Sequence, residues 1–326
     1  MADWKLRDTQ PQFARIRSLP EQRVPENVFV MLLLAIAYLI GTRLGTYLVL
    51  LPVIMVMQVT GHSMQAFHES PGFFAFQLYL TLVSIAVTLL ICRGIECRPL
   101  RTAGLTKHHC VRDYLLGAVI GFAMFSAVIG LNYAAGSVRA GSSDAPLDLP
   151  FMLLIAGGWI IQGFSEEFAF RGFMMMSAGT YKKPWIAVIF SALMFGAAHI
   201  GNSGSTVSGV LNVALFGVIM SLYMLRTDSI WGAAALHSVW NWTQGSFFGL
   251  KVSGLDTGSS VLHFVQTDSA AWMNGGSFGL EGGLATTVVQ IIVILFLLFL
   301  VPQRCLPLRA TLKMPRAGSH WRSTPR

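Results

Sequence analysis

The sequence predicts an all-α fold, a polytopic membrane helix bundle of about eight transmembrane helices. Three observations support this prediction: the composition, the length of the apolar segments and the placement of the positive charges. Of the 326 residues, 54% are hydrophobic and 12% are charged, and the mean hydropathy is +0.60. Soluble domains carry about 25% charged residues, so this composition is typical of an integral membrane protein.

Eight apolar segments are separated by polar or glycine-rich stretches, and most of them approach the roughly 20 residues that a spanning helix needs. The first contains the polar interruption GTRLG at Gly41–Gly45; we still expect one tilted helix, because a split would invert the charge topology. The eight segments cover residues 28–59, 73–92, 114–133, 151–177, 184–199, 207–225, 229–248 and 284–301.

Lysine and arginine residues gather on one side of these segments. If both termini are cytoplasmic, the external loops carry only Arg139 and Lys251, and nearly all other basic residues lie inside. This bias follows the positive-inside rule and predicts a multi-pass protein of a bacterial-type inner or plasma membrane. The basic tail 302–326 would then lie in the cytoplasm, against anionic lipid.

The segments also suggest a domain organisation, with no internal repeat and no soluble domain. We expect a cytoplasmic N-terminal segment, three leading helices, a core of four helices, an external loop with the last helix, and the basic tail. Their bounds are 1–27, 28–149, 150–248, 249–301 and 302–326.

The cysteines give little support for a structural metal. All four lie on or near the predicted inner face, where thiols stay reduced. A zinc site from Cys97, His108, His109 and Cys110 matches no usual ligand spacing. Free thiols in a basic loop are the better interpretation.

Two adjacent glutamates and an arginine interrupt the segment 151–177, in the sequence SEEFAFRG. An ionised side chain near the bilayer centre costs about 2.5–3.5 kcal/mol even on lenient scales. Glu167 and Arg171 are four residues apart, so they share a helix face and can pair. Glu166 is rotated about 100° away and needs another partner. The cluster either joins helices structurally or provides a carboxylate for proton transfer.

The next helices carry further polar residues at helical spacing. Phe195 and His199 lie four apart near the end of the segment 184–199, and His237 and Asn241 lie four apart within 229–248. Helix bundles build sites from inward side chains of facing helices. A carboxylate and an imidazole can deprotonate water, while a second imidazole and a carboxamide can stabilise an oxyanion. Alternatively, Glu166, His199 and His237 could hold a divalent metal such as zinc.

These motifs, in this order, resemble the CPBP family of intramembrane proteases, which are related to type II CAAX prenyl endopeptidases and to bacteriocin-processing and immunity (Abi) proteins. The resemblance covers about 150–248 and implies a membrane-anchored protein or peptide substrate, cut near a C-terminal or lipidated segment. It implies that Glu166 activates water with the help of His199, and that Glu167 and Arg171 orient the site. His237 and Asn241 would stabilise the oxyanion, and Asn202 matches a further polar position. Family members are usually called metalloproteases, although a metal requirement is disputed. We expect lipid and peptide partners and no nucleic acid.

Three other functions compete with this interpretation. The sequence GNSG at Gly201–Gly204 has the form of a rhomboid serine motif, with Ser203 as nucleophile and His237 as base. In rhomboid proteases, however, the histidine motif precedes the serine, and this alternative leaves the glutamates unexplained. A proton-coupled transporter could use Glu166 as a relay, but no inverted repeat is present. A non-proteolytic scaffold or immunity protein could keep the same residues. No H-E-x-x-H motif is present.

Two expectations concern geometry. Counted from the segment boundaries, Glu166 falls toward the inner side of its helix and His199 toward the outer end of its own. They can meet only if a helix is tilted or broken, or if a boundary is wrong. The basic inner loops further suggest that substrate enters from the cytoplasmic side.

Overall fold

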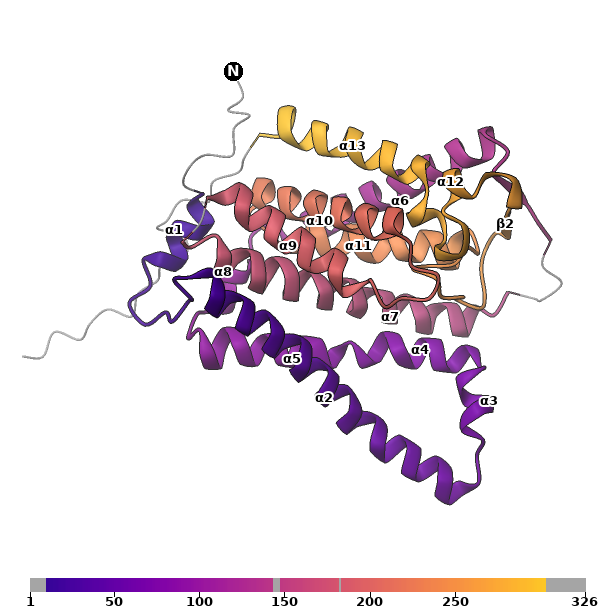
Figure 1. Cartoon of the computed structure of the whole chain (residues 1–326), viewed down its shortest axis with the longest axis horizontal. Helices are drawn as coiled ribbons and strands as arrows, with labels where there is room; N and C mark the ends of the chain where they lie inside the picture. Colours follow the sequence, from indigo (N-terminus) through magenta and orange to yellow (C-terminus); the bar gives the residue numbers. More distant parts are fainter. Residues whose placement is uncertain (1–9, 143–146, 182, 303–326) are drawn as a thin grey trace, which may run out of the picture.

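The chain is described by a computed structural model over residues 10–142, 147–181 and 183–302. Its long helices lie side by side and roughly parallel to one direction, except for α2 (Val28–Thr60), which crosses them obliquely (Figure 1). In these described ranges the one sheet has two short antiparallel strands, β1 (Val138–Ala140) and β2 (Phe264–Gln266). The predicted all-α membrane bundle is confirmed.

The remaining elements follow in chain order. The α-helices are α1 (Pro11–Arg17), α3 (Met64–His68), α4 (Pro71–Leu80), α5 (Leu82–Leu90), α6 (Cys110–Ala134), α7 (Leu149–Glu167), α8 (Met176–Ala178), α9 (Pro184–Ala198), α10 (Val207–Thr227), α11 (Trp231–Trp242), α12 (Ala271–Asn274) and α13 (Leu284–Phe299). Short 3₁₀ and π turns extend or connect them: η1 (Ile91–Ile95), η2 (Leu100–Ala103), η3 (Phe168–Met175), η4 (Thr243–Phe247), η5 (Asp268–Ala270), η6 (Gly276–Phe278) and η7 (Leu280–Gly282).

Five of the predicted spans are helices long and apolar enough to cross a bilayer within the described residues. The other three predicted segments are helical but shorter: α9 has 15 residues, α11 has 12 and α13 has 16. At about 1.5 Å per residue, 15 residues reach about 22 Å, which is less than the roughly 30 Å of the hydrocarbon core. Helix α9 is therefore too short to cross the hydrocarbon core alone, whereas α11 continues directly into η4.

The first predicted segment forms one uninterrupted helix, as expected. The side chain of Asn27 caps the start of α2 by accepting a hydrogen bond from the Val30 amide, at 2.9 Å. Gly61, with φ of 72°, ends the helix in the left-handed conformation that glycine adopts at no steric cost. Its 33 residues give about 50 Å of helix, longer than a bilayer core, which fits the oblique course.

Small residues bring α11 close to both α6 and α7. A Cβ atom added at Gly117 or Gly121 of α6 would stand 2.0 Å or 2.4 Å from a carbonyl oxygen of α11. On the other side, Gly163 of α7 lies directly against Ser238 of α11. Close approach through small residues is the usual way in which membrane helices pack, because apolar burial alone gives little drive in lipid. Helix α11 is thus held between two neighbours.

The two predicted external loops are joined into one ordered cap. Strand β1 comes from the loop before α7 and β2 from the loop after α11, with Arg139 opposite Val265 in the register. The side chain of Asn274 adds a hydrogen bond to the Ser137 carbonyl, at 2.8 Å. Because the loops pair, they lie on the same side of the bundle, as the charge topology requires.

The N-terminal segment contains a helix that the sequence analysis missed, because seven residues are too few for a periodic pattern. Helix α1 docks on the end of α10, where Arg15 pairs with Asp228 and Gln12 donates to the Leu225 carbonyl at 3.0 Å. Residues 1–9 and the basic tail beyond Pro302, which we expected to lie against lipid, are outside the described residues.

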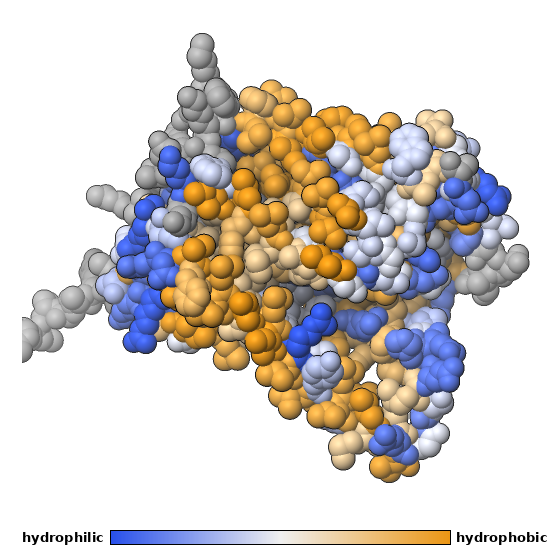
Figure 2. Space-filling view, in the orientation of Figure 1, coloured by the Kyte–Doolittle hydropathy of each residue, from blue (hydrophilic) through white to orange (hydrophobic). Residues whose placement is uncertain are grey.

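The face seen in Figure 2 is apolar over a broad middle band and hydrophilic at both ends of the long axis. Many large hydrophobic side chains are exposed, for example Leu48, Val59 and Val207 at 69%, 87% and 79%. Such exposure is unfavourable in water and favourable in lipid. Figure 2 also shows a hollow between α2 and the other helices, with hydrophilic side chains inside the apolar band.

Candidate active site

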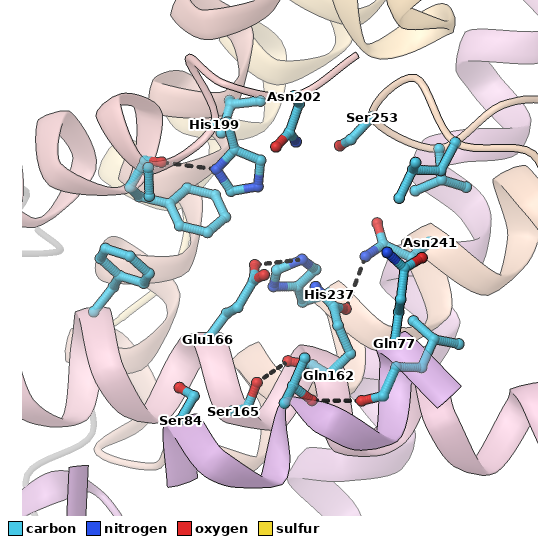
Figure 3. A pocket seen from close by; sticks show the side chains of 18 of the residues that line it. Gln77, Ser84, Gln162, Ser165, Glu166, His199, Asn202, His237, Asn241 and Ser253 are labelled. Atoms are coloured by element: carbon cyan, nitrogen blue, oxygen red, sulfur yellow. Dashed lines mark hydrogen bonds and ion pairs between the residues drawn. The ribbon is translucent and has the colours of Figure 1, made fainter. Parts of the chain in front are cut away.

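A pocket of about 760 Å³ lies in the middle of the bundle, lined by side chains from α2, α4, α7, α10 and α11 and from the turn after α9. Of the six residues that we expected in the site, four line this pocket: Glu166, His199, His237 and Asn241 (Figure 3). The other two, Glu167 and Arg171, are fully buried beside it. The structure thus brings together side chains from three helices separated by up to 75 residues in sequence.

Glu167 connects the two motifs. Its Oε1 accepts a hydrogen bond from Arg171 Nη1 at 3.0 Å, which is the pairing expected one helical turn apart. The same oxygen contacts His237 Nδ1 at 2.9 Å. The guanidinium of Arg171 also lies over the ring of Phe195, 4.4 Å from its centroid, and this cation–π contact compensates part of its desolvation. Arg171 and Glu167 therefore hold the His237 ring from behind the pocket.

Glu166 points into the pocket instead. Its Oε2 lies 3.7 Å from His237 Nε2, longer than a hydrogen bond, and has no hydrogen-bond partner among the described residues. The side chain is 22% exposed, whereas that of Glu167 is 0% exposed. The rotation between adjacent helical residues thus produces two carboxylates with different environments. Glu166 is the one available to bind water.

Both imidazoles present their Nε2 atoms to the pocket. His199 Nδ1 contacts the Phe195 carbonyl at 2.8 Å, and because a carbonyl only accepts, Nδ1 carries the proton. The His237 Nδ1 atom likewise donates to the Glu167 carboxylate. A neutral ring of either histidine therefore has its lone pair on Nε2. The imidazole nearest to Glu166 is that of His237, while His199 lies across the same space (Figure 3).

The carboxamide of Asn241 is oriented by a residue that the sequence analysis did not identify. Its Nδ2 donates to Gln162 Oε1 at 3.0 Å, which leaves the second Nδ2 hydrogen for the pocket. Gln162 precedes Glu166 by one helical turn on α7, so both lie on one face. Asn202, in the turn after α9, also lines the pocket.

The apparent mismatch in depth between Glu166 and His199 is explained by the short helix α9. Residues Leu149–Ala178 form one continuous helical run of 30 residues, and Glu166 lies 12 residues before its end, about 18 Å along the axis. Helix α9 starts at Pro184, near that end, and His199 follows its last residue, about 22 Å along. The two side chains therefore lie at similar distances, about 18 and 22 Å, from the end of the bundle at which the α7 run ends and α9 begins.

The helix that carries the glutamates becomes a π-helix directly after Glu167, at η3. Wider π turns weaken the regular hydrogen-bond ladder and occur often at functional sites. Here a neighbouring side chain satisfies a backbone carbonyl of the segment: Ser191 Oγ of α9 donates to the Phe170 oxygen at 2.8 Å. The bond also fixes α9 against η3.

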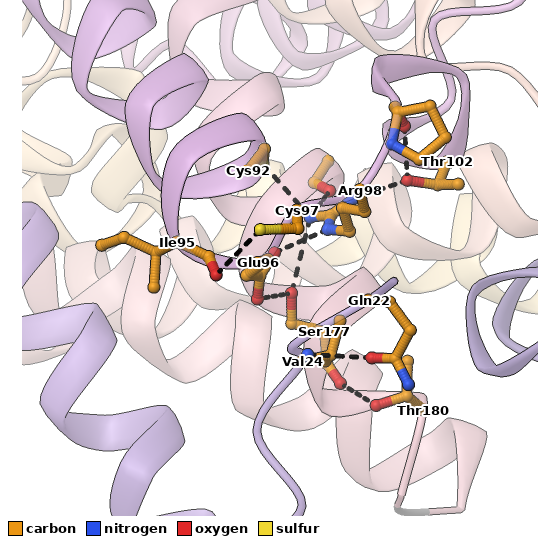
Figure 4. Close-up of polar contacts among 12 residues, drawn as sticks. Gln22, Val24, Cys92, Ile95, Glu96, Cys97, Arg98, Thr102, Ser177 and Thr180 are labelled. Carbon is orange, nitrogen blue, oxygen red and sulfur yellow. Dashed lines mark hydrogen bonds and ion pairs between the residues drawn. The ribbon is translucent and has the colours of Figure 1, made fainter. Parts of the chain in front are cut away.

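A second group of side chains holds the middle of η3 and the short helix α8 that follows it. Arg98 donates from Nη2 to the Gly172 carbonyl at 2.9 Å and from Nε to Glu96 at 2.6 Å (Figure 4). Ser177 in turn donates to Glu96 at 2.6 Å. The side chains of Arg98 and Glu96 are both 0% exposed. A buried pair of this kind is strongly position-specific, because removing one partner leaves an unpaired buried charge.

Further pocket residues lie outside the motifs of the sequence analysis. Glu281 of η7 lines the pocket, and its Oε2 accepts from the Ser253 amide and hydroxyl at 2.6 and 2.9 Å. Burial raises the pKa of the Glu281 carboxyl, although the hydrogen bonds from Ser253 and the nearby His199 and His237 act in the opposite direction. Its glycine-rich surroundings gave no periodic signal that could have identified it.

The alternative metal ligands of the sequence analysis, Glu166, His199 and His237, meet only part of what a metal site requires. Each Nδ1 atom is held by an acceptor, which is the usual outer-shell arrangement of ligating histidines. Over the described ranges, however, no three His, Cys, Asp or Glu side chains are close enough together to share one ion. The donor types fit zinc but their arrangement does not, and no step below uses a metal.

The remaining candidates are not supported by their positions. In the described part of the chain, Ser203 is exposed and lies outside the pocket lining, and the ring nitrogens of His237 face glutamates. The rhomboid arrangement is therefore absent. Cys97 and Cys110 are free thiols, and with His108 and His109 they form no metal cluster among the residues described.

The pocket lining also argues against the expected entry from the basic side. Val252, Ser253, Leu255 and Glu281 come from the segment between α11 and α13, which the charge topology places outside. Within the described residues, the basic loop 93–113 contributes nothing to the lining. The cap formed by the two paired loops is thus closer to the pocket than the basic face is.

One comparison with known proteins gave a match. Residues 148–243 match a family model described as type II CAAX prenyl endopeptidase, Rce1-like. The matched range contains all six residues that we expected in the site. Neither the curated proteins nor the solved structures gave a match to the chain.

Proposed function

We propose that this chain, which matches the Rce1-like model of type II CAAX prenyl endopeptidases over residues 148–243, hydrolyses a peptide bond near the C-terminus of a lipidated, membrane-anchored protein or peptide. The observation that carries this proposal is the Glu166 carboxylate, which lies in a large pocket inside an apolar bundle, without a hydrogen-bond partner among the described residues and opposite two imidazole Nε2 atoms.

In the first step, Glu166 takes a proton from a water molecule bound between it and His199. The His199 Nε2 lone pair accepts the second hydrogen of this water and so orients the oxygen lone pair toward the substrate carbonyl. The new bond between water oxygen and carbonyl carbon turns the carbonyl oxygen into an oxyanion. Positioned donors at this oxyanion are commonly worth 10²–10³-fold in rate each.

His237 and Asn241 supply these donors. Asn241 uses the Nδ2 hydrogen that Gln162 leaves free, and His237 donates from Nε2 when the ring is doubly protonated. In the second step the tetrahedral intermediate collapses, the C–N bond breaks, and Glu166 returns its proton to the departing amine. Glu167, Arg171 and Gln162 act as positioning residues, because they hold the donors and do not face the reacting atoms.

A direct test uses a peptide that ends in S-farnesyl-Cys-Val-Ile-Ser and the purified protein in lipid nanodiscs. Glu166→Gln is expected to reduce cleavage by at least about 10³-fold, while thermal unfolding stays near that of the wild type, because Glu166 makes no hydrogen bond to lose. Ser203→Ala is the matched control and should cleave normally.

Two outcomes would refute the proposal. The first is a wild-type protein that binds but never cleaves such peptides, which would indicate a scaffold that keeps the family fold. The second is full cleavage by Glu166→Gln. Proton-linked flux in liposomes that depends on Glu166 would instead favour the transporter alternative. Cleavage that persists after treatment with a chelator would agree with the finding that, among the described residues, Glu166, His199 and His237 are not close enough together to share one metal ion.

A further inference from the structure

Arg43 is a charged residue for which the reaction above gives no role. It lies near the middle of the 33-residue helix α2, is exposed, and makes no hydrogen bond or ion pair with any described residue. A cation at the centre of the bilayer costs about 2.5–3.5 kcal/mol or more, and such residues usually face a partner or a hydrated cavity. Its position therefore requires an explanation.

Arg43 faces the pocket. The α2 residues that line the pocket recur at helical spacing and form one face of the helix: Tyr38, Leu39, Thr42, Arg43 and Thr46. Among the described residues that line the pocket, Arg43 is the one lysine or arginine. The hollow with hydrophilic side chains beside α2 in Figure 2 lies within the apolar band. The cation is thus directed toward the space that holds Glu166.

The depth of Arg43 indicates what kind of anion it can bind. Phospholipid phosphates lie at the two interfaces, about 15 Å from the bilayer centre. Arg43 lies about 22 Å of helix from the first residue of α2 and about 25 Å from the last, far from both interfaces. An anion that reaches this depth has to enter with a ligand of the pocket.

Arg43 lies a little over one helical turn along α2 from Tyr38, which is a neighbour of Glu166. Tyr38 packs against Phe170, with ring centroids 6.2 Å apart, and lies close enough to Glu166 to interact with it electrostatically. Arg43 follows Tyr38 by five residues, about 7.5 Å along the axis. Three extended residues span about 10 Å, so a carboxylate three residues beyond the cleaved bond would fall within reach of the Arg43 side chain.

We propose that Arg43 binds the α-carboxylate of the substrate's C-terminal residue and so selects peptides that end a few residues beyond the cleaved bond. The inference rests on the proposed protease function and adds the substrate feature that the enzyme recognises. A guanidinium matches a carboxylate with two parallel N–H···O bonds, which a lysine cannot reproduce. Arg43 is a specificity residue and takes no part in bond breaking.

The experiment compares the farnesylated peptide as a free acid with the same peptide as a C-terminal amide. For the wild type we expect kcat/KM for the acid to exceed that for the amide by about 10- to 100-fold. Arg43→Gln should reduce kcat/KM for the acid peptide to the value for the amide peptide, mainly by raising KM, and should leave kcat/KM for the amide peptide unchanged. Arg43→Lys should recover part of the preference. Arg112→Gln, an exposed arginine at the start of α6, is the matched control.

Binding of both peptides to the Glu166→Gln protein, measured by fluorescence anisotropy, separates this inference from the proposed function. An acid preference in binding that disappears in Glu166→Gln/Arg43→Gln supports the role of Arg43 even if the wild type cleaves nothing. Cleavage without an acid preference, or a preference that survives Arg43→Gln, overturns the inference and leaves the protease function intact. If Arg43→Gln weakens binding of the acid and amide peptides equally, the inference is overturned, and Arg43 instead has a structural or lipid-binding role. If neither peptide binds or is cleaved, both proposals fail.

Discussion

Replacing Gly121 by alanine is expected to disable the site without altering any residue in it. Gly121 of α6 lies against the backbone of Leu236, the residue before His237 on α11. The added Cβ atom would stand 2.4 Å from the Leu236 carbonyl oxygen, whereas ordinary contacts begin at 3.4 Å. Because the obstacle is backbone, which cannot rotate away, α6 and α11 must separate locally by about 1 Å.

The consequence for the site can be worked out from the hydrogen bond that holds His237. The Nδ1 atom lies 2.9 Å from Glu167 Oε1, and a displacement of about 1 Å is enough to take this pair past the limit of a hydrogen bond. A misplacement of that size can cost about 10²-fold in rate. Overpacking itself should lower the free energy of unfolding by about 1–3 kcal/mol.

The assay is cleavage of the farnesylated peptide in nanodiscs, with thermal unfolding measured in parallel. Gly130→Ala is the matched control: it lies on the same helix, its added Cβ atom meets nothing within 4 Å, and activity should stay within about twofold of the wild type. If Gly121→Ala and Gly130→Ala were equally active and equally stable, the argument that α6 positions His237 through a glycine contact would be refuted.

Three further predictions concern the polar contacts. Arg171→Met should lower the free energy of unfolding by about 3–5 kcal/mol, because it removes the arginine counter-ion of the buried Glu167 carboxylate. Thermal and denaturant unfolding would show this, and an added Glu167→Gln substitution should recover part of the loss. Gln162→Leu should lower kcat about tenfold with little change in KM, since it frees Asn241 to rotate; unchanged steady-state kinetics would contradict this. Burial raises the pKa of the Glu281 carboxyl above its ordinary value of 4.5. The protonated carboxyl therefore stabilises the fold below pH 4.5, and this stabilisation is lost as the pH rises through the raised pKa of Glu281. Glu281→Gln should reduce this pH dependence, measured by hydrogen exchange over 249–283.

The parts of the site that depend on local geometry could be predicted from the sequence. A spacing of four residues places Glu167 and Arg171 on one helix face, and the structure shows them paired. The rotation of adjacent residues separates Glu166 from that pair, and Glu166 indeed faces another partner. Hydropathy located the helices because lipid requires long apolar segments with internally satisfied backbones.

The parts that depend on contacts between helices could not be predicted. The bond between Glu167 and His237 joins residues 70 positions apart, and it forms because Gly163 lets α7 approach Ser238 on α11. The position of His199 depends on where α9 ends, which hydropathy does not define within a few residues. Gln162 was visible as a polar residue one turn before Glu166, but a single polar residue has no partner until the packing is known.

The two buried ion pairs of the core have a common consequence, because both act on the same π-helical segment. Glu167 with Arg171 joins the residue before η3 to its middle, while Arg98 and Glu96 hold the Gly172 carbonyl and Ser177, which follows η3. A π-helix lacks part of the regular hydrogen bonding that would define its position alone. Buried charges are costly, and replacing such pairs by apolar residues is often neutral for stability. Their presence along this segment is therefore better explained by position than by stability: together they fix η3, and so the direction in which Glu166, two residues before η3, points into the pocket.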